Sequence, residues 1–277
     1  MGGRVVGPEV LAARAAVLTT GFDADTALQL LEDGRWRGHV HAHWFVTSGP
    51  NGGFLAALAA RALELAVDTP PRSLTLHYLA APQEGPIEIA VTIERAGRTT
   101  TFARLAFAQD DQPVCVALAA CAPWRDDQPE WDDTRRPDAP PPEDCEPLRP
   151  SDGMPAFLRN YEMRWLGWDT ERRPAWVGGW MRTPDPRPSD HALLAAMTDA
   201  YMPPAFLRLP ERIFVPTIDL TIHFRSEPPP GAHPWVLGIF TTRMAAGGVC
   251  EEDGELWSED GRLLVQSRQL AIVRRPR

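Results

Sequence analysis

The chain has 277 residues, of which 44% are hydrophobic and 23% charged, with a formal net charge of −9 at pH 7. This composition is typical of a globular protein, and the length suffices for one large core or two domains of ordinary size. The negative balance argues against nucleic acid or an anionic membrane surface as a partner, because both are bound through clustered basic residues.

The N-terminal segment and the cysteines indicate the cellular compartment. Residues 1 to 22 contain only short apolar runs broken by Arg and Glu, and no stretch of the chain approaches the roughly 20 apolar residues of a membrane helix. Cys115, Cys121, Cys145 and Cys250 show no paired metal-binding spacing. We therefore expect buried free thiols, a reducing cytoplasm and no membrane insertion.

The first half of the chain predicts two short strands, one long helix and a small sheet. The candidate strands are RWRGHV at residues 35 to 40 and HWFVTS at residues 43 to 48. The helix covers residues 49 to 67, opens with Pro-Asn-Gly and is apolar nearly all round, so we expect protein to surround it. Four alternating segments from Ser73 to residue 122 then predict an antiparallel sheet.

Residues 123 to 155 predict a linker between two domains. This segment is dense in Pro and Asp, a composition that favours extended chain over a packed core. We therefore expect an N-terminal domain at residues 1 to 122 and a C-terminal domain at residues 156 to 277.

The second half repeats the order of the first. YEMRWLGW and AWVGGWMR predict two strands, and a helix follows in SDHALLAAMTDAYMPPAFL. Ser189 or Asp190 is the expected N-cap of this helix, and Pro203 with Pro204 the expected stop. Four further alternating segments, beginning at Asp219, predict a second antiparallel sheet.

The two sheets begin with nearly the same phrase, RSLTLHY at residues 72 to 78 and TIDLTIHF at residues 217 to 224. Aligning the phrases places Asp219 where the first copy has Ser73. Counting back from the turns QDDQP and SEDGR places Gln269 where the first copy has Ala120. The copies share the pairs Thr75/Thr221 and His77/His223, and this duplication predicts that they belong to the scaffold. Positions that differ indicate the site, so we expect one active site per chain.

A long helix wrapped by a curved antiparallel sheet is the hot-dog fold, and two copies in one chain form a double hot dog. In the stretches GPNGGFLAALAARAL, LTLHY/LTIHF and AAGGVCEEDGELWSEDGRLLVQSRQLA, the chain resembles the acyl-CoA thioesterase II-like (TesB-like) family. The resemblance implies an α+β protein in which two curved antiparallel sheets each wrap one long helix and pair as a pseudo-dimer. It also implies hydrolysis of acyl-CoA to free acid and CoA, without a metal or organic cofactor.

The resemblance further implies a water molecule activated by an Asp, a Thr or Ser, and a Gln of the C-terminal half. The matching positions are Asp219, Thr242 and Gln269, with Thr241 as the alternative hydroxyl. Asp219 has two open roles, as a general base or as a nucleophile that forms an anhydride.

Thioester hydrolysis also needs donors for the oxyanion that forms on the carbonyl. Unpaired backbone N–H groups at a helix start can supply them. Gly52 and Gly53 would let a ligand approach the backbone closely, so we expect them to bind the oxyanion or substrate, at a site between the halves. The alternative is that they only allow close helix packing.

Other readings stay open. His223 shares a strand face with Asp219, which would suit a hot-dog enoyl-thioester hydratase or dehydratase, although its twin His77 favours a structural role. A non-catalytic acyl-thioester-binding protein is the third function. Asp199, near the end of the second helix, either faces the site or caps a turn. A homodimer formed through an exposed sheet edge also stays open.

Overall fold

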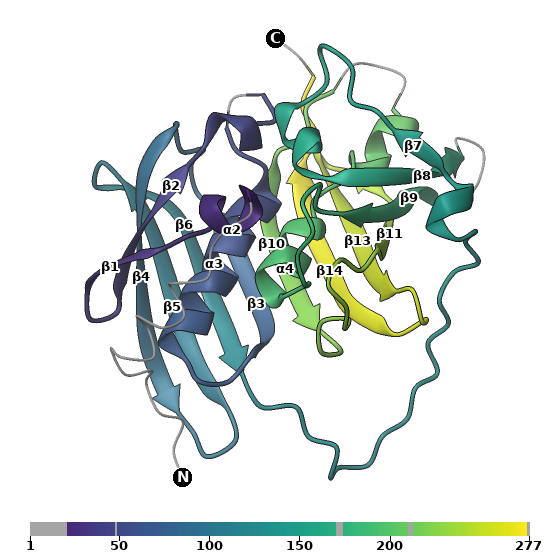
Figure 1. Ribbon diagram of the computed structural model, residues 1–277. Helices are drawn as coiled ribbons and strands as arrows, with labels where there is room; N and C mark the ends of the chain where they lie inside the picture. Colours follow the sequence, from purple (N-terminus) through teal and green to yellow (C-terminus); the bar gives the residue numbers. More distant parts are fainter. Residues whose placement is uncertain (1–20, 48, 170–173, 210–212, 276–277) are drawn as a thin grey trace.

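The computed structural model describes residues 21–47, 49–169, 174–209 and 213–275. Its described strands form one antiparallel sheet of 14 strands, against which the helices pack (Figure 1). The elements of the N-terminal half are α2 (Gly21–Asp25), β1 (Gln29–Glu32), β2 (Arg35–Val40), η1 (Ala42–Trp44), α3 (Gly52–Ala66), β3 (Pro71–Tyr78), β4 (Gly85–Ala96), β5 (Thr101–Gln109) and β6 (Gln112–Cys121).

The elements of the C-terminal half follow a long connection after β6. They are η2 (Pro142–Asp144), β7 (Glu146–Leu148), η3 (Ala156–Asn160), β8 (Glu162–Asp169), β9 (Ala175–Arg182), α4 (His191–Met197), η4 (Pro204–Leu207), β10 (Thr217–Phe224), β11 (Val236–Thr242), β12 (Ala245–Ala246), β13 (Val249–Ser258) and β14 (Leu263–Ile272). The predicted strands at 35 to 40 and 175 to 182 are confirmed as β2 and β9. The predicted strand at 43 to 48 is wrong, because this segment begins in the 3₁₀ turn η1.

The helix α3 is the central element of the N-terminal half, as its all-round apolar sequence predicts. Eleven of its residues are buried, among them Phe54, Leu58 and Leu63. Its N-terminus lies against the end of α4, and the two helices pack side by side (Figure 1). The surrounding protein removes most of the apolar surface of the helix from water, and this burial stabilises the fold.

The helix α4 is much shorter than predicted. Asp190 is its N-cap, since the carboxylate accepts a hydrogen bond from the Leu193 N–H at 2.8 Å. The helix ends at Met197 after seven residues, well before Pro203. The C-terminal half therefore lacks the long helix that the double hot-dog expectation assigned to it, and Asp199 lies just past the helix end.

The two halves share one sheet instead of the two separate sheets that we expected. The strand order is β1-β2-β4-β5-β6-β3-β10-β14-β13-β11-β9-β8-β7, with β12 beside β13. The duplicated strands β3 and β10 pair with each other in antiparallel register. Thr75 lies opposite Thr221, and their hydroxyl oxygens are 3.1 Å apart. The pairing of β3 with β10 is therefore symmetric about the Thr75/Thr221 pair.

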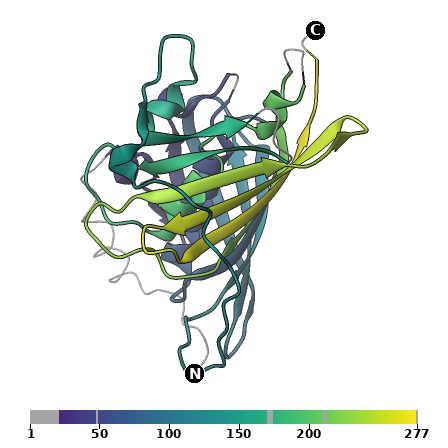
Figure 2. The same ribbon diagram turned by 90° about the vertical axis from the view of Figure 1, so that its right-hand side faces the viewer.

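The sheet curves around the helices. In Figure 2 the strands of the C-terminal half lie in front of the helices and cover them on this side. The buried side chains Leu74, Leu76, Leu220 and Ile222 of the paired strands form part of one core that includes both helices. The core therefore continues across the junction between the halves.

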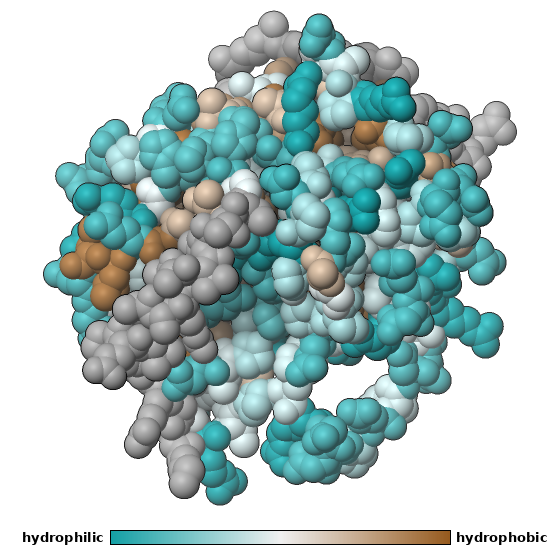
Figure 3. All heavy atoms as spheres, in the orientation of Figure 1, coloured by the Kyte–Doolittle hydropathy of each residue, from teal (hydrophilic) through white to brown (hydrophobic). Residues whose placement is uncertain are grey.

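The connection between the halves is extended only in its first part. It leaves β6 and stands off the body as a largely hydrophilic arc (Figures 1 and 3). From Pro140 onward it packs on the C-terminal half, where the Pro140 carbonyl accepts a hydrogen bond from the Trp180 indole at 2.8 Å. The segment then adds β7 to the sheet beside β8, so the chain does not remain linker-like up to residue 155.

All four cysteines are buried free thiols, as predicted. In the part of the chain that the structure describes, no helix has the length and apolar character that crossing a membrane would require.

Candidate active site

A carboxylate from the C-terminal half is held at the start of α3 in the N-terminal half. Asp199 Oδ2 accepts hydrogen bonds from Asn51 Nδ2 at 2.8 Å and from the Gly53 N–H at 3.1 Å. The same Asn51 nitrogen donates to the backbone carbonyl of Asp199 at 2.7 Å. The first N–H groups of a helix have no partner within it and favour negative charge nearby. The contact therefore satisfies the helix start and fixes Asp199.

Gln269 on β14 connects this carboxylate to two further polar groups. Its Nε2 donates to Asp199 Oδ1 at 3.1 Å and to Glu252 Oε1 on β13 at 2.9 Å. Its Oε1 accepts a hydrogen bond from the Thr217 hydroxyl on β10 at 2.8 Å. Gln269 and Glu252 are buried, while Asp199 and Thr217 keep some exposed surface. The amide is thus held at both ends, and its N–H groups point toward two carboxyl groups.

The surroundings distinguish the two carboxyl groups. Burial raises the pKa of Asp199, and hydrogen bonds from Gln269, Gly53 and Asn51 partly offset this effect. Burial, together with the nearby charge of Asp199, raises the pKa of Glu252 well above its usual value. When two carboxyl groups accept hydrogen bonds from the same amide nitrogen, the state in which only one of them is ionised is favoured. The better-solvated and more strongly hydrogen-bonded Asp199 is the one that ionises first as the pH rises.

The replacement Glu252→Gln is expected to stabilise the protein relative to wild type at alkaline pH. A carboxyl whose pKa is raised on folding contributes stability below its unfolded pKa of about 4.3, and this is lost as the pH rises through the folded-state pKa. Gln keeps the shape without the ionisable proton. The difference in Tm between variant and wild type should therefore grow from about pH 5 to pH 9 in thermal unfolding. The exposed Glu84→Gln is the control, and a difference independent of pH would contradict the assignment.

Asp219 lies on the other face of the sheet from Gln269. The pairing of β10 with β14 contains a β-bulge between Thr217 and Asp219, and beyond it Asp219 pairs with Leu270. The buried Leu220 pairs with Gln269 instead. Because neighbouring side chains on a strand point to opposite faces, Asp219 points outward, as Leu270 does. The structure does not bring Asp219 together with Gln269.

Thr242 is also separated from Gln269. It lies at the end of β11, and β13 stands between β11 and β14, so two strand spacings of about 4.8 Å separate their backbones. Its hydroxyl is buried and has no hydrogen-bond partner among the described residues. The alternative Thr241 pairs with Asp253 and points to the opposite face from Thr242. The hydroxyl that contacts Gln269 belongs to Thr217.

Gly52 and Gly53 do lie at the site, but the structure engages them with Asp199. The Gly53 N–H points to the carboxylate, and the Gly52 carbonyl accepts a hydrogen bond from the Tyr78 hydroxyl at 2.9 Å. A Cβ at residue 53 would collide with the carbonyl oxygen of Ala196. Gly53 therefore also allows the close approach of α3 and α4, and its binding of an oxyanion or substrate stays a prediction.

Asp199 and Thr217 carry signals that the sequence interpretation did not use. Asp199 follows the second helix closely, and Thr217 is the first residue of the duplicated strand phrase. Both stand at the end of a predicted element, where a side chain can turn toward a neighbouring half. The decisive information, namely the length of α4 and the bulge in β10, has no clear signature in the sequence.

Comparison with protein families supports the resemblance. The model described as "Acyl-CoA thioesterase N-terminal domain" matches residues 40–122, and the one described as "Acyl-CoA thioesterase C-terminal domain" matches residues 142–273. The chain belongs to the acyl-CoA thioesterase family. No curated protein matches the chain at a significant level.

Solved structures similar to this family member share its fold. A conserved protein of unknown function with a hot-dog fold, from Alicyclobacillus acidocaldarius, is 28% identical with a TM-score of 0.85, covering 94% of this chain and 100% of the other. A putative thioesterase II from Thermobifida fusca is 26% identical with a TM-score of 0.82, covering 94% and 99%. The acyl-CoA thioesterase II TesB2 from Mycobacterium marinum, 21% identical with a TM-score of 0.73, covers 92% and 99% and shows likeness of fold. The chain thus has a fold of the hot-dog type, built on a large antiparallel sheet.

Proposed function

We propose that the protein hydrolyses acyl-CoA thioesters with a water molecule activated by Asp199. One observation carries this proposal: Asp199 is held by both halves in a way that leaves it able to accept a proton. Its Oδ2 takes the donors at the start of α3, whereas Oδ1 accepts only the hydrogen bond from Gln269 among the contacts of the described residues. Among these contacts Oδ1 therefore has capacity for a further hydrogen bond, and the Asp199 side chain is only partly exposed.

The reaction follows from this arrangement. A water hydrogen-bonded to Asp199 Oδ1 attacks the thioester carbonyl carbon while its proton passes to the carboxylate. The tetrahedral intermediate then collapses, the C–S bond breaks, and the CoA sulfur leaves as a thiolate that takes up the proton from Asp199. The products are the free acid and CoA, and Asp199 returns to its ionised form.

Gln269 and Thr217 act as positioning residues. The Thr217 hydroxyl donates to Gln269 Oε1, and the opposite end of the amide donates to Asp199. This chain of hydrogen bonds fixes the side chain of the base and favours its ionised form, because the donor from Gln269 lowers the pKa that burial raises. The donors at the start of α3 serve the same purpose.

The replacement Thr217→Val is expected to reduce kcat for acyl-CoA hydrolysis by about tenfold, the effect of losing one hydrogen bond of roughly 1.4 kcal/mol. Thr217→Ser keeps the donor and should restore most of the rate. Thr242→Val is the matched control and should leave the rate near that of wild type. If kcat falls strongly in the Thr242 variant and is unchanged in the Thr217 variant, the hydroxyl that assists hydrolysis is that of Thr242 on β11.

The hydratase alternative has less support. It depends on a carboxylate working with a histidine, and no histidine is among the hydrogen-bond partners of Asp199 in the described chain. Asp219 does lie opposite His77, yet both belong to the outward face of the paired strands. Incubating the purified protein with acyl-CoA and enoyl-CoA separates the functions: free thiol release supports the thioesterase, and a change in enoyl absorbance without thiol release supports the hydratase. If neither thiol release nor a change in enoyl absorbance occurs, the result favours the non-catalytic binding protein.

A further inference from the structure

Three histidines alternate near the end of β2 in the sequence HVHAH, and the proposed reaction uses none of them. His39 lies on β2, His41 precedes η1, and His43 lies within η1. The ring centres of His39 and His41 are 4.5 Å apart, and those of His41 and His43 are 5.2 Å apart. Side chains at alternate positions thus gather on one side of this segment.

A carboxylate from a different element meets two of these rings. Asp25, the last residue of α2, has Oδ2 at 2.7 Å from His43 Nε2 and Oδ1 at 3.8 Å from His41 Nε2. One donor atom of each residue lies within 4.8 Å of the other two. His41 and Asp25 are partly buried, and His43 is exposed. The chain therefore brings together two imidazoles of one segment and a carboxylate that lies 18 residues before His43.

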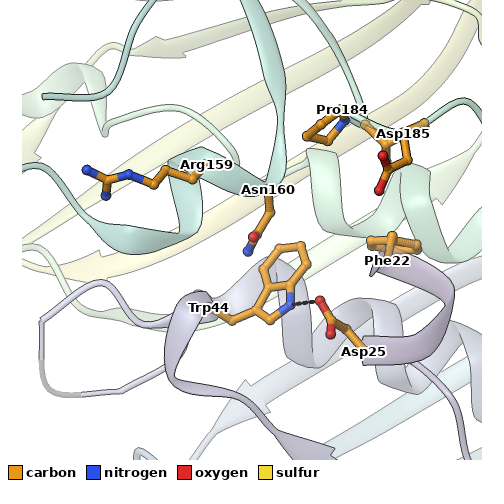
Figure 4. Close-up of a pocket in the computed structure, with 8 residues that line it drawn as sticks. Phe22, Asp25, Trp44, Arg159, Asn160, Pro184 and Asp185 are labelled. Atoms are coloured by element: carbon orange, nitrogen blue, oxygen red, sulfur yellow. Dashed lines mark hydrogen bonds between the residues drawn. The ribbon is translucent and has the colours of Figure 1, made fainter. Parts of the chain in front are cut away.

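A hydrogen bond from a buried side chain also orients the Asp25 carboxylate. Asp25 Oδ2 accepts a hydrogen bond of 2.9 Å from the indole N–H of Trp44, whose side chain is fully buried (Figure 4). A carboxylate that binds a metal is typically oriented by such a second hydrogen bond. Trp44 is itself stacked on Phe54 of α3, with ring centres 4.9 Å apart. The Asp25 carboxylate is therefore firmly placed, with Oδ2 beside His43 and Oδ1 beside His41.

We propose that Asp25, His41 and His43 bind one Zn²⁺ ion. Imidazole nitrogen and carboxylate oxygen are the ligand types of zinc sites with three protein ligands and an open position. Zinc–ligand distances are about 2.0 to 2.2 Å, so the three donor atoms need only small side-chain movements to surround one ion. The exposed His43 is free to make the largest of them. His39 is adjacent in the motif but outside the ligand set.

The position of the site suggests what the ion would do. Asp25 and Trp44 border a hollow of about 180 Å³ whose opposite wall comes from the C-terminal half, including Asn160 (Figure 4). Asn160 Nδ2 donates to the His43 carbonyl at 3.1 Å, and the Asn51 N–H donates to the Trp44 carbonyl at 2.8 Å. The ion would tie α2 to the segment that leads into α3 within the N-terminal half, next to this contact with the C-terminal half.

Zinc binding to the full-length protein, free of any histidine tag and stripped with a chelator, tests this inference. Competition with a chromophoric chelator is expected to show one Zn²⁺ per chain. The variants His41→Ala and His43→Ala should each weaken binding by more than about tenfold, whereas His39→Ala should bind as wild type does. Added Zn²⁺ should also raise the Tm of wild type and of His39→Ala, but not that of His43→Ala.

Three results would overturn the inference. They are the absence of binding to wild type beyond that of the His41→Ala/His43→Ala double variant, equal weakening by His39→Ala, and full binding by Asp25→Asn. Because His43 is exposed, its replacement should not impair folding, and the Tm of the zinc-free variant checks this. The measurement is independent of thioester hydrolysis, so it holds whether or not the proposed function is correct.

Discussion

The replacement Asp199→Asn is expected to lower kcat for acyl-CoA hydrolysis by roughly 10²- to 10⁴-fold, the range that a positioned general base contributes. Asn has nearly the same shape but cannot accept the proton of the attacking water. Thiol release from acyl-CoAs of several chain lengths measures the effect. Some loss of stability should accompany it, about 0.5 to 2 kcal/mol, since the carboxylate also satisfies the start of α3.

Asp219→Asn is the matched control for this experiment. The chain offers the same substitution on a nearby strand, at the position that the repeat and the family resemblance favoured. Because Asp219 points away from Gln269, we expect its variant to keep a rate near that of wild type. If activity is lost in the Asp219 variant and kept in the Asp199 variant, the general base is Asp219 on β10.

The replacement Gln269→Ala is expected to reduce kcat by about 10²-fold and to shift the acid limb of the pH–rate profile to higher pH. The base works only when ionised, so the rate rises as the pH passes upward through the pKa of Asp199. Burial already raises this pKa, and the donor from Gln269 counteracts the rise. Losing the donor therefore raises the pKa further, and a higher pH is needed to ionise the carboxylate.

The shift of the pH profile distinguishes a positioning role from loss of structure. A variant that is merely less stable would lose rate without moving the acid limb. Gln266→Ala, three residues earlier on β14 and paired with His223, is the control and should show neither change. If Gln269→Ala lowers the rate with an unaltered profile, the amide does not tune Asp199, and its contact with Glu252 would be the one to test next.

The sequence was sufficient to predict elements whose formation depends on local pattern. The all-round apolar run of α3 predicted that protein surrounds it, and the segments RWRGHV and AWVGGWMR predicted β2 and β9 with their observed bounds. The duplication of LTLHY and LTIHF predicted two related halves, and the shared Thr75 and Thr221 do meet at their junction. The family followed from the order of these motifs.

The site was only partly predictable. Gln269 and Gly53 contact Asp199 in the candidate site and Gly52 adjoins it, whereas Asp219 and Thr242 do not contact Gln269. For Asp199 the sequence allows two roles, facing the site or capping a turn. The repeat marked both Asp219 and Gln269 as positions without a counterpart in the first half, and only Gln269 contacts Asp199. It could not indicate the face on which each side chain lies.

The sequence by itself therefore determined the local elements, their duplication and the family, because periodicity and turn residues act over a few positions along the chain. Tertiary structure alone decided which polar groups meet. A bulge between Thr217 and Asp219 reverses the face of every residue beyond it, since strand side chains alternate with a period of two. The early end of α4 then places Asp199 against the start of α3. Both outcomes depend on packing between segments distant in sequence, and for that reason they were visible only in the folded chain.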